Sequence, residues 1–391
     1  MTMKKIFIFL AAAFCLASAI GQEKAESMLY VKDHIYVKSQ INGKNATLVF
    51  DTGSPYTCID SIFLALSNLQ YKNVGKATMG GAGKNVEKVR IIIDELTYTV
   101  LGKKYKSKIS PVIKLKPIVG DLADGILGID NMGDKVISID YVGEQISFND
   151  RLGDTTGYTS IPIRYHKNSI YVPLSVTVRD GLTIEGEGLL DIGSGNSISF
   201  TSAVAKQYGL QDVSPQVSYY QAIGGIGGDA SGSDFRAKSV TIGGIKLNDV
   251  TMDYSHNASG ALSSMDYIAL IGNEFLEHFD IIIDLVGKRI FIKPNAKFDK
   301  PFESPVVGFG YTDRSRTLGC WVVNGLYANS NAEKAGLRSG DHIVAFNGRS
   351  VKDIDIEKTR DVFDGLNAVT LTVQRDDTQL EISFNFDEPK I

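Results

Sequence analysis

One short pattern occurs twice in this chain of 391 residues, and no other feature constrains the possible folds as strongly. Residues 48–54 read LVFDTGS and residues 188–194 read GLLDIGS, which places Asp51 and Asp191 140 positions apart. In each copy an apolar run leads into an Asp that is followed by a Gly and a Ser. A carboxylate at the end of a buried strand costs free energy unless it is hydrogen-bonded or has a chemical role. The pattern therefore predicts two equivalent strand ends, each of which presents a carboxylate.

The sequence around the two motifs repeats as well, which indicates an internal duplication and not a chance match. The matching segments are 35–37 with 170–172, 80–83 with 224–228, 125–130 with 269–273, and 136–143 with 279–287. At corresponding residues, the last three segments lie four positions farther from Asp191 than from Asp51. One short insertion before the glycine-rich segment explains this constant excess. The chain therefore contains two homologous halves, and their Asp residues are predicted to meet.

Two carboxyl groups that face each other in a buried site cannot both ionise easily, so they share a proton and act as acid and base on one water molecule. Other chemistries find little support in the sequence. Its five His residues are scattered, without a His-Glu-x-x-His pattern or a Cys pair that would hold zinc. The glycine clusters match neither the Walker nor the dinucleotide-binding pattern. Ile192 stands where a serine-nucleophile motif around Ser194 would need Gly.

The Asp-Thr-Gly-Ser motif at 51–54, the glycine clusters and the apolar-apolar-Gly segments together resemble the pepsin and retropepsin superfamily in its bilobal, single-chain form. The resemblance covers about residues 28–293. It implies a mainly β chain with two homologous retropepsin-like β-barrel lobes that form one pepsin-like unit. The many short Val, Ile, Thr and Tyr runs, with 39 glycines and 10 prolines, also favour strands and turns over helices.

The same resemblance implies an aspartic endopeptidase whose catalytic dyad is Asp51 and Asp191, and which needs no metal or organic cofactor. The residues that would support the two active-site loops are Thr52, Gly53, Ser54, Gly193 and Ser194. The hydroxyls of Ser54 and Ser194 are expected to hydrogen-bond the neighbouring carboxylates. The glycine-rich hairpins would be mobile flaps over a polypeptide substrate, with Gly80, Gly81 and Gly83 in the first and Gly224, Gly225 and Gly227 in the second.

One residue departs from the family pattern. Members have Thr or Ser after each Asp, and this hydroxyl ties the two loops together; Thr52 has it, but Ile192 does not. A buried hydrogen bond contributes about 0.5–1.5 kcal/mol net. The sequence therefore leaves open an alternative, a catalytically impaired protease-like protein that binds peptides or serves as a scaffold. A third hypothesis, an obligate dimer of complementary lobes, conflicts with the complete internal repeat, so we expect a monomer.

The C-terminal part carries a second resemblance. Residues 331–343 read NAEKAGLRSGDHI, which resembles the PDZ signature of a small helix, Ala-Gly-Leu, Gly-Asp and a strand. This implies a small α+β PDZ domain over 303–391, after a proline-marked linker. PDZ domains add an extended chain to a strand edge and hold its terminal carboxylate on backbone amides. The implied carboxylate loop is Gly308, Phe309, Gly310 and Tyr311. The partner would be a protein C-terminus, or else the domain only packs against the protease.

The N-terminus predicts a secretory signal peptide over 1–21, because Lys4 and Lys5 precede an apolar stretch and small residues permit cleavage after Ala19 or Gly21. The first lobe is then expected over 22–150 and the second over 151–295. Export without a disulfide framework suits a periplasm, a cell surface or an extracellular location, with Cys58 and Cys320 as buried thiols. We expect no stable membrane span. The net charge of −4 argues against a nucleic-acid partner.

Overall fold

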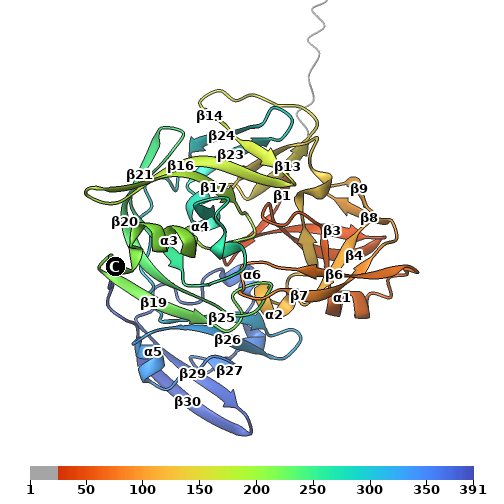
Figure 1. Cartoon of the computed structure of the whole chain (residues 1–391). Coiled ribbons are helices and arrows are strands. Elements are labelled where there is room, and N and C mark those ends of the chain that lie inside the picture. Colours follow the sequence, from red (N-terminus) through yellow and green to blue (C-terminus); the bar gives the residue numbers. More distant parts are fainter. Residues whose placement is uncertain (1–24) are drawn as a thin grey trace, which may run out of the picture.

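The computed structural model describes residues 25–391, so the predicted signal peptide lies outside the described residues. This part of the chain is mainly β, with short helices at the ends of strands (Figure 1). The first lobe, the second lobe and the C-terminal domain all contact one another. The predicted fold class is confirmed: two β lobes built from homologous halves are accompanied by a small α+β domain.

The first-lobe sheet contains the strand that leads to Asp51. Its order is β6 (Val74–Met79), β7 (Glu87–Ile92), β10 (Ser110–Ile113), β5 (Cys58–Asp60), β11 (Gly125–Leu127), β4 (Lys44–Phe50), β3 (His34–Ile41), β8 (Leu96–Val100) and β9 (Lys103–Ser107), and β2 (Leu29–Val31) also pairs with β3. Asn42 and Gly43 form the turn between β3 and β4 with positive φ angles of 45° and 77°. This is the geometry that an Asn-Gly hairpin turn requires.

A bridging sheet joins the two lobes through their homologous C-terminal hairpins. Its order is β1 (Glu26–Ser27), β13 (Gln145–Asn149), β12 (Val136–Asp140), β23 (Phe279–Asp284), β24 (Arg289–Pro294) and β14 (Thr159–Pro162). At the seam, β12 pairs antiparallel with β23, with Ile137 opposite Ile283. Strands of the two halves thus share one ladder of backbone hydrogen bonds, which fixes the lobes relative to each other.

The long sheet runs from the second lobe into the C-terminal domain. Its order is β15 (Arg164–His166), β16 (Ser169–Arg179), β17 (Leu182–Leu190), β22 (Ala269–Ile271), β18 (Ile198–Phe200), β21 (Ile245–Ser255), β20 (Ala230–Ile242), β19 (Gln216–Gln221), β26 (Cys320–Tyr327), β27 (His342–Phe346), β29 (Ala368–Arg375) and β30 (Thr378–Asn385). Two further strands, β25 (Phe309–Arg314) and β28 (Arg349–Ser350), pair with β26 and β27. The domain boundary is therefore crossed by the β19–β26 pairing.

The helices are short. They are α1 (Ser61–Leu66), α2 (Lys116–Val119), α3 (Ser202–Tyr208), α4 (Asn273–Leu276), α5 (Asn331–Lys334) and α6 (Ile356–Thr359), with 3-10 turns at η1 (Ile129–Asn131), η2 (Leu210–Asp212), η3 (Ala261–Ser263) and η4 (Val351–Asp353). The pattern over 356–366 predicts one helix, but α6 ends at Thr359, and Arg360 follows with φ 64°. Leaving helical geometry there lets the Arg360 side chain reach the first lobe, where its guanidinium donates to the Tyr30 carbonyl.

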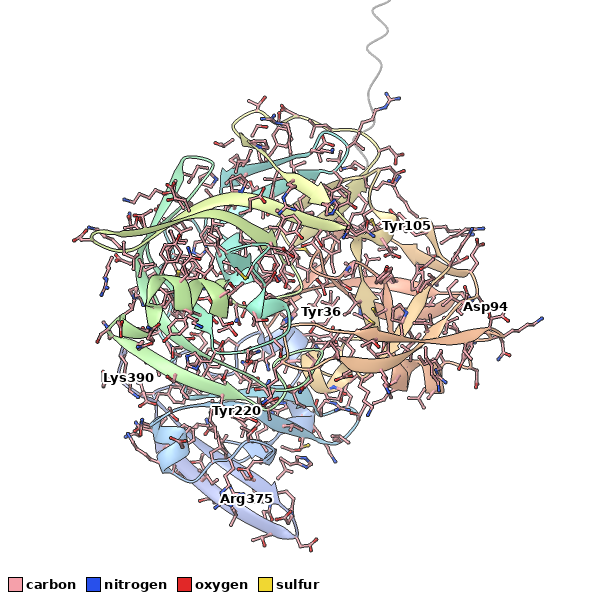
Figure 2. The ribbon with its side chains drawn as sticks, in the orientation of Figure 1. Tyr36, Asp94, Tyr105, Tyr220, Arg375 and Lys390 are labelled. Atoms are coloured by element: carbon pink, nitrogen blue, oxygen red, sulfur yellow. The ribbon has the colours of Figure 1, made fainter. Side chains whose placement is uncertain are left out.

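Two large hydrophobic clusters form most of the core of the described residues, and each crosses a lobe or domain boundary. The larger contains buried residues of both lobes, among them Phe50 and Ile192. The second joins the first lobe to the C-terminal domain, where Trp321 is fully buried. Tyr36 belongs to this second cluster and lies near the centre of the molecule (Figure 2). Both predicted buried thiols, Cys58 and Cys320, are confirmed as free and buried.

A buried ion pair lies in the interface between the first lobe and the C-terminal domain. Arg314 Nε donates to Asp121 Oδ1 at 2.8 Å, with the two side chains only 8% and 1% exposed. Thr317 adds a backbone N–H bond of 2.7 Å to the other carboxylate oxygen. Removing one partner of a buried pair leaves an uncompensated charge away from water.

We therefore expect Asp121→Ala to lower the free energy of unfolding by about 3–5 kcal/mol. The matched control is Glu95→Ala, which breaks the exposed pair of Glu95 with Lys106 and should cost far less, because water screens exposed ion pairs. Urea unfolding of both variants measures the difference. A loss at Asp121 no larger than that at Glu95 would show that the interface does not depend on this ion pair.

Candidate active site

Parallel strand pairing places each motif Asp at the end of an interior strand of its sheet. In the first lobe β4 runs parallel to β11, and the Asp51 N–H donates to the Leu127 carbonyl at 3.1 Å. In the second lobe β17 runs parallel to β22, and the Asp191 N–H donates to the Ile271 carbonyl at 2.9 Å. The apolar-apolar-Gly segments predicted to brace the active-site loops thus do so at the level of the backbone.

The glycine that ends each bracing segment allows a close backbone approach. A Cβ added at Gly128 would lie 2.3 Å from the Tyr56 carbonyl oxygen. At Gly272 the added atom would lie 2.3 Å from the Asn196 carbonyl oxygen. Any side chain would push the active-site loop away from the brace, which explains why the sequence has Gly at both equivalent positions.

The two motif loops face each other, and their carboxyl groups meet. A Cβ at Gly53 would lie 2.5 Å from Asp191 Oδ1, and one at Gly193 would lie 2.2 Å from the Asp51 carboxyl carbon. The side chains of Asp51 and Asp191 are hydrogen-bonded to each other. Both line the floor of a cleft of about 500 Å³ between the lobes. The predicted meeting of the two Asp residues is therefore present in the geometry.

The environment of the two carboxyls favours one shared proton. Burial raises the pKa of Asp51, although the backbone N–H groups of Ser54 and Gly53 oppose that shift. The pKa of Asp191 is raised well above its ordinary value, first by burial and then by the Asp51 charge. Two carboxyls in contact cannot both ionise cheaply, so the pair keeps a proton at a pH where isolated Asp residues have lost theirs.

The serine hydroxyls do not have the expected role. Ser54 Oγ donates to the Tyr56 carbonyl at 2.8 Å, and it is the Ser54 backbone N–H that donates to Asp51 Oδ1, at 2.9 Å. Ser194 Oγ accepts a bond from the Asn196 N–H at 3.4 Å. The prediction that these hydroxyls bond the carboxylates is wrong, because the tight turn after each Asp already directs backbone N–H groups at it.

Thr52 ties the two loops together across the lobe interface. Its Oγ1 donates to the Leu190 carbonyl at 2.7 Å and accepts from the Ile192 N–H at 3.0 Å. Thr52 is fully buried, so both bonds are shielded from water. Ile192 provides no such bonds in return, and its fully buried side chain packs in the inter-lobe hydrophobic cluster instead. The first loop thus contributes hydrogen bonds to the contact between the loops, and the second loop contributes apolar packing.

Asn273 adds a second connection that the sequence reasoning missed. It is the first residue of α4 and is fully buried; its Nδ2 donates to the Ile192 carbonyl at 2.6 Å and to the Asp33 carbonyl at 2.7 Å. Tyr141 of the first lobe donates to Asn273 Oδ1 at 2.8 Å. These bonds hold the second loop to the first lobe on the side where Ile192 has no hydroxyl. The repeat could have pointed to this residue, because the equivalent position of the first half is the apolar Ile129, so a polar residue at 273 breaks the pattern.

His34 also supports the second loop and was not predicted. Its ring Nδ1 lies 2.6 Å from the Lys32 carbonyl, and the ring contacts the backbone of Gly193. Burial lowers the pKa of His34, which favours a neutral ring beside the dyad. No spacing pattern in the sequence connects His34 with residues 193–195.

The two glycine-rich hairpins meet above the dyad. The first tip donates backbone bonds to the second, from Gly83 N–H to the Ile226 carbonyl at 3.0 Å and from Asn85 N–H to the Gly227 carbonyl at 3.0 Å. Lys84 forms an ion pair of 2.5 Å with Asp229. The predicted glycines at 80, 81, 224 and 225 line the cleft, and positive φ angles of 140° at Gly225 and 100° at Gly227 shape the second tip. The hairpins therefore form a roof over the carboxyls.

The two hairpins differ in what holds their outer edges. Among the described residues, β6 of the first hairpin is the terminal strand of its sheet. In the second hairpin β19 pairs on its outer side with β26 of the C-terminal domain, with Tyr220 opposite Leu326. The C-terminal domain thus holds the second hairpin in a continuous sheet and leaves the edge of the first hairpin free.

The predicted carboxylate loop of the C-terminal domain does not line the dyad cleft, and first-lobe residues cover its strand edge. Phe309 is buried, and Lys32 Nζ donates to the Tyr311 carbonyl at 2.8 Å while lying 3.3 Å from the centre of its ring. The Asp121 N–H donates to the Asp313 carbonyl at 2.9 Å. A peptide that added to this edge of β25 would have to displace these first-lobe contacts.

Comparison with known proteins identifies one part of the chain by sequence. The family described as PDZ domain matches residues 322–375. No curated protein matched the chain. Among solved structures, the crystal structure of aspartic proteinase from Irpex lacteus is similar, with a TM-score of 0.47 and 14% identity over 72% of this chain and 99% of that one.

The described residues offer neither a cluster of metal-binding side chains nor a helix suited to span a membrane. Residues 25–391 contain no group of three or more His, Cys, Asp or Glu side chains placed to hold a metal ion. The same residues include no helix with the length and apolar character that crossing a membrane would require.

The role of Thr52 can be tested by Thr52→Val, which keeps the shape and removes the hydroxyl. Because the Ile192 N–H and the Leu190 carbonyl would lose a buried partner, the free energy of unfolding should fall by about 1–3 kcal/mol. The matched control is Thr177→Val on an exposed strand position, which should change it by less than about 0.5 kcal/mol. Equal losses of unfolding free energy in the two variants would show that the Thr52 hydroxyl does not stabilise the inter-lobe connection.

The shared proton has a consequence for stability. Because the pKa of Asp191 is raised in the folded chain, its contribution to stability is fully present below the unfolded pKa of about 3.9 and is lost as pH rises through the folded value. Asp191→Asn removes this titration. The variant should therefore gain melting temperature relative to the wild type between pH 4 and neutral pH. A constant difference across this range would mean that the pKa of Asp191 is not raised.

Proposed function

We propose that this chain is an aspartic endopeptidase that hydrolyses peptide bonds in polypeptides. The observation that carries the proposal is the contact between the Asp51 and Asp191 carboxyl groups at the floor of the inter-lobe cleft, beneath two glycine-rich hairpins. Water-mediated hydrolysis of an amide needs a carboxyl pair with one shared proton, a cleft that gives the substrate access to it, and a cover that shields the reaction from bulk water. The dyad, the inter-lobe cleft and the two hairpins correspond to these three elements.

In this mechanism the two carboxyls have complementary roles. The ionised carboxyl, favoured at Asp51 by N–H bonds from Ser54 and Gly53, takes a proton from the attacking water as general base. The protonated carboxyl, favoured at Asp191 by burial and by the neighbouring charge, donates a hydrogen bond to the scissile carbonyl and stabilises charge on its oxygen. The proton then passes to the leaving amine, and the pair returns to its starting state.

Substrate entry requires the roof to open, because the hairpin tips are bonded to each other. The first hairpin is the one that moves in our proposal, since its outer strand is at the sheet edge while the second is held by β26. The main chain of a bound peptide would replace the bonds that the tips now make with each other. Residues 80–83 and 224–227 would then contact the substrate backbone.

The absence of a hydroxyl at Ile192 does not argue against this activity. The Thr52 bonds and the Asn273 bonds hold the second loop to the first lobe from both sides. The C-terminal domain has a structural part in the proposal, because β26 supports the second hairpin and the first lobe covers the edge of β25. We further propose that the chain is exported and acts as a monomer on unfolded chains.

Activity is tested with an unfolded protein as substrate. Asp51→Asn and Asp191→Asn should each lower the cleavage rate by roughly 10²- to 10⁴-fold or more, while Asp180→Asn, at an exposed site, should leave it unchanged. Since the pKa values of both dyad residues are raised, the rate should peak in mildly acidic buffer and fall once the pair loses its last proton. Full activity in either dyad variant would exclude this mechanism.

A further inference from the structure

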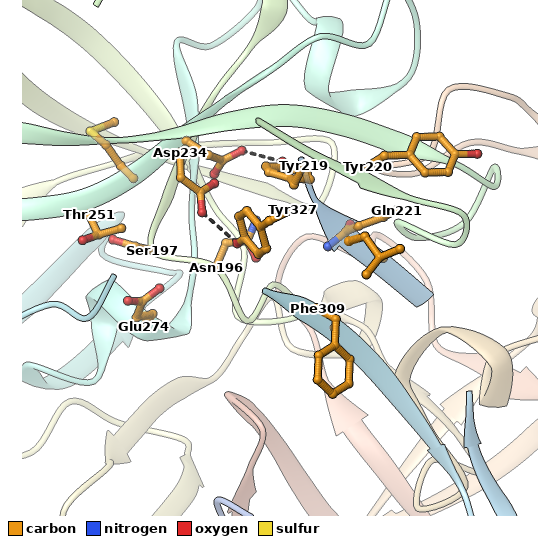
Figure 3. A pocket seen from close by; sticks show the side chains of 15 residues that line it. Asn196, Ser197, Tyr219, Tyr220, Gln221, Asp234, Thr251, Glu274, Phe309 and Tyr327 are labelled. Carbon is orange, nitrogen blue, oxygen red and sulfur yellow. Dashed lines mark hydrogen bonds between the residues drawn. The ribbon is translucent and has the colours of Figure 1, made fainter. Parts of the chain in front are cut away.

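A second cavity, of about 230 Å³, lies between the second lobe and the C-terminal domain (Figure 3). The second hairpin strand forms one wall through Tyr219 and Gln221, and the C-terminal domain forms another through Phe309 and Tyr327. The cavity shares four lining residues with the dyad cleft, which are Asn196, Tyr219, Gln221 and Glu274. The cavity therefore adjoins the dyad cleft, at a place where a side chain of a bound peptide could enter it.

Acidic groups line this cavity, whereas no Lys, Arg or His is among the described residues that line it. Two of its carboxylates already have partners: Asp234 accepts from the Tyr327 hydroxyl at 2.7 Å, and Asp253 accepts from the Tyr219 hydroxyl at 2.9 Å. The third, Glu274, has only repulsive charge interactions with other carboxylates in the described part of the chain, and burial raises its pKa to about 8. Glu274 is thus a carboxyl group without a hydrogen-bond or ion-pair partner among the described residues, and a cation placed beside it would lower its pKa and favour its ionised form.

Two buried hydroxyl groups in the same cavity also lack a partner. Ser197 is 3% exposed and Thr251 is 7% exposed, and neither hydroxyl has a hydrogen-bond partner among residues 25–391. Figure 3 shows both near Glu274 on one side of the cavity, with Phe309 on the other. Buried polar groups without partners are uncommon in folded proteins, so their grouping in one cavity points to a ligand that supplies donors.

We propose that this cavity is a specificity pocket for a basic side chain of the polypeptide substrate, in which Glu274 pairs with the cation and Ser197 and Thr251 accept its remaining N–H groups. The proposal rests on the proposed peptidase function and adds the substrate class. It also assigns a role to the C-terminal domain, because Phe309 and Tyr327 of that domain complete the wall.

An arginine side chain fits the chemistry best. Its guanidinium offers five N–H donors in a plane and bonds carboxylates through two parallel hydrogen bonds, while its methylene stem packs against apolar and aromatic groups. Phe309 and Leu326 provide such surface here. Pairing with a cation also removes the repulsion that the neighbouring carboxylates exert on Glu274.

The test uses matched synthetic peptides. Cleavage of a random peptide mixture by the full chain, mapped by mass spectrometry, should show Arg or Lys enriched at one fixed position relative to the cleaved bond. A peptide with Arg there should then exceed its citrulline counterpart, which has nearly the same shape and no charge, by roughly 10- to 100-fold in kcat/KM. Equal kcat/KM for the two peptides would overturn the proposal.

Three variants locate the preference. Glu274→Gln should reduce the ratio of kcat/KM for Arg over citrulline to near one, while the control Glu381→Gln, which removes an exposed charge on β30 away from the pocket, should keep it. Thr251→Val should reduce the ratio without lowering the melting temperature, because the hydroxyl it removes has no partner. An unchanged ratio in Glu274→Gln would show that the basic side chain is recognised elsewhere.

A binding measurement separates this inference from the proposed activity. Fluorescent peptide pools with Arg fixed at each position in turn, and the matching citrulline pools, are titrated against the Asp51→Asn variant. Tighter binding of one Arg pool, lost on adding Glu274→Gln, supports the pocket even if the wild type cleaves nothing, in which case the peptidase proposal alone fails. Cleavage by the wild type without any Arg preference overturns the pocket and leaves the peptidase proposal standing.

Discussion

The contact between two carboxyl groups at the lobe interface is the constraint on which the rest of this structure depends. Two acidic side chains brought together in a buried place repel each other once both are ionised, and the chain must hold them there against that repulsion. The bridging sheet, the parallel braces behind each Asp and the Thr52 bonds all serve this purpose. The sheet and the braces use backbone hydrogen bonds, which side-chain substitutions leave in place, whereas the Thr52 connection depends on one side-chain hydroxyl.

The two halves of the duplicated unit have diverged in how they hold this contact. The first half provides Thr52, whose single hydroxyl bonds two backbone groups of the second loop. The second half has an apolar Ile192 at the equivalent place and a polar Asn273 one loop later, which bonds back to the first lobe. The hydrogen bonds that Ile192 cannot make are thus replaced by those of Asn273. This is possible because the dyad requires a fixed distance between the two loops and not a particular residue.

The C-terminal PDZ domain contacts both lobes and so helps to hold the site together. Through β26 it extends the sheet of the second hairpin, and through Arg314 and Tyr311 it bonds the first lobe. An edge strand that pairs with another strand loses its freedom to bend, so the domain makes the two hairpins unequal. First-lobe residues cover the edge of β25, and residues of the domain form one wall of the cavity beside Glu274.

The sequence by itself determined the duplicated halves, the two Asp residues at equivalent strand ends, the glycine-rich hairpins and the PDZ signature at 331–343. These features depend on local strand, turn and glycine requirements, which can be recognised in the order of the residues. Only the tertiary structure revealed the features that depend on contacts between segments far apart in the sequence. The Asn273 connection, the support of the second hairpin by β26 and the partnerless Glu274 join segments far apart in the chain. The hydroxyls of Ser54 and Ser194 were wrongly assigned for the same reason, since which donor reaches a carboxylate is set by the folded turn and not by residue type.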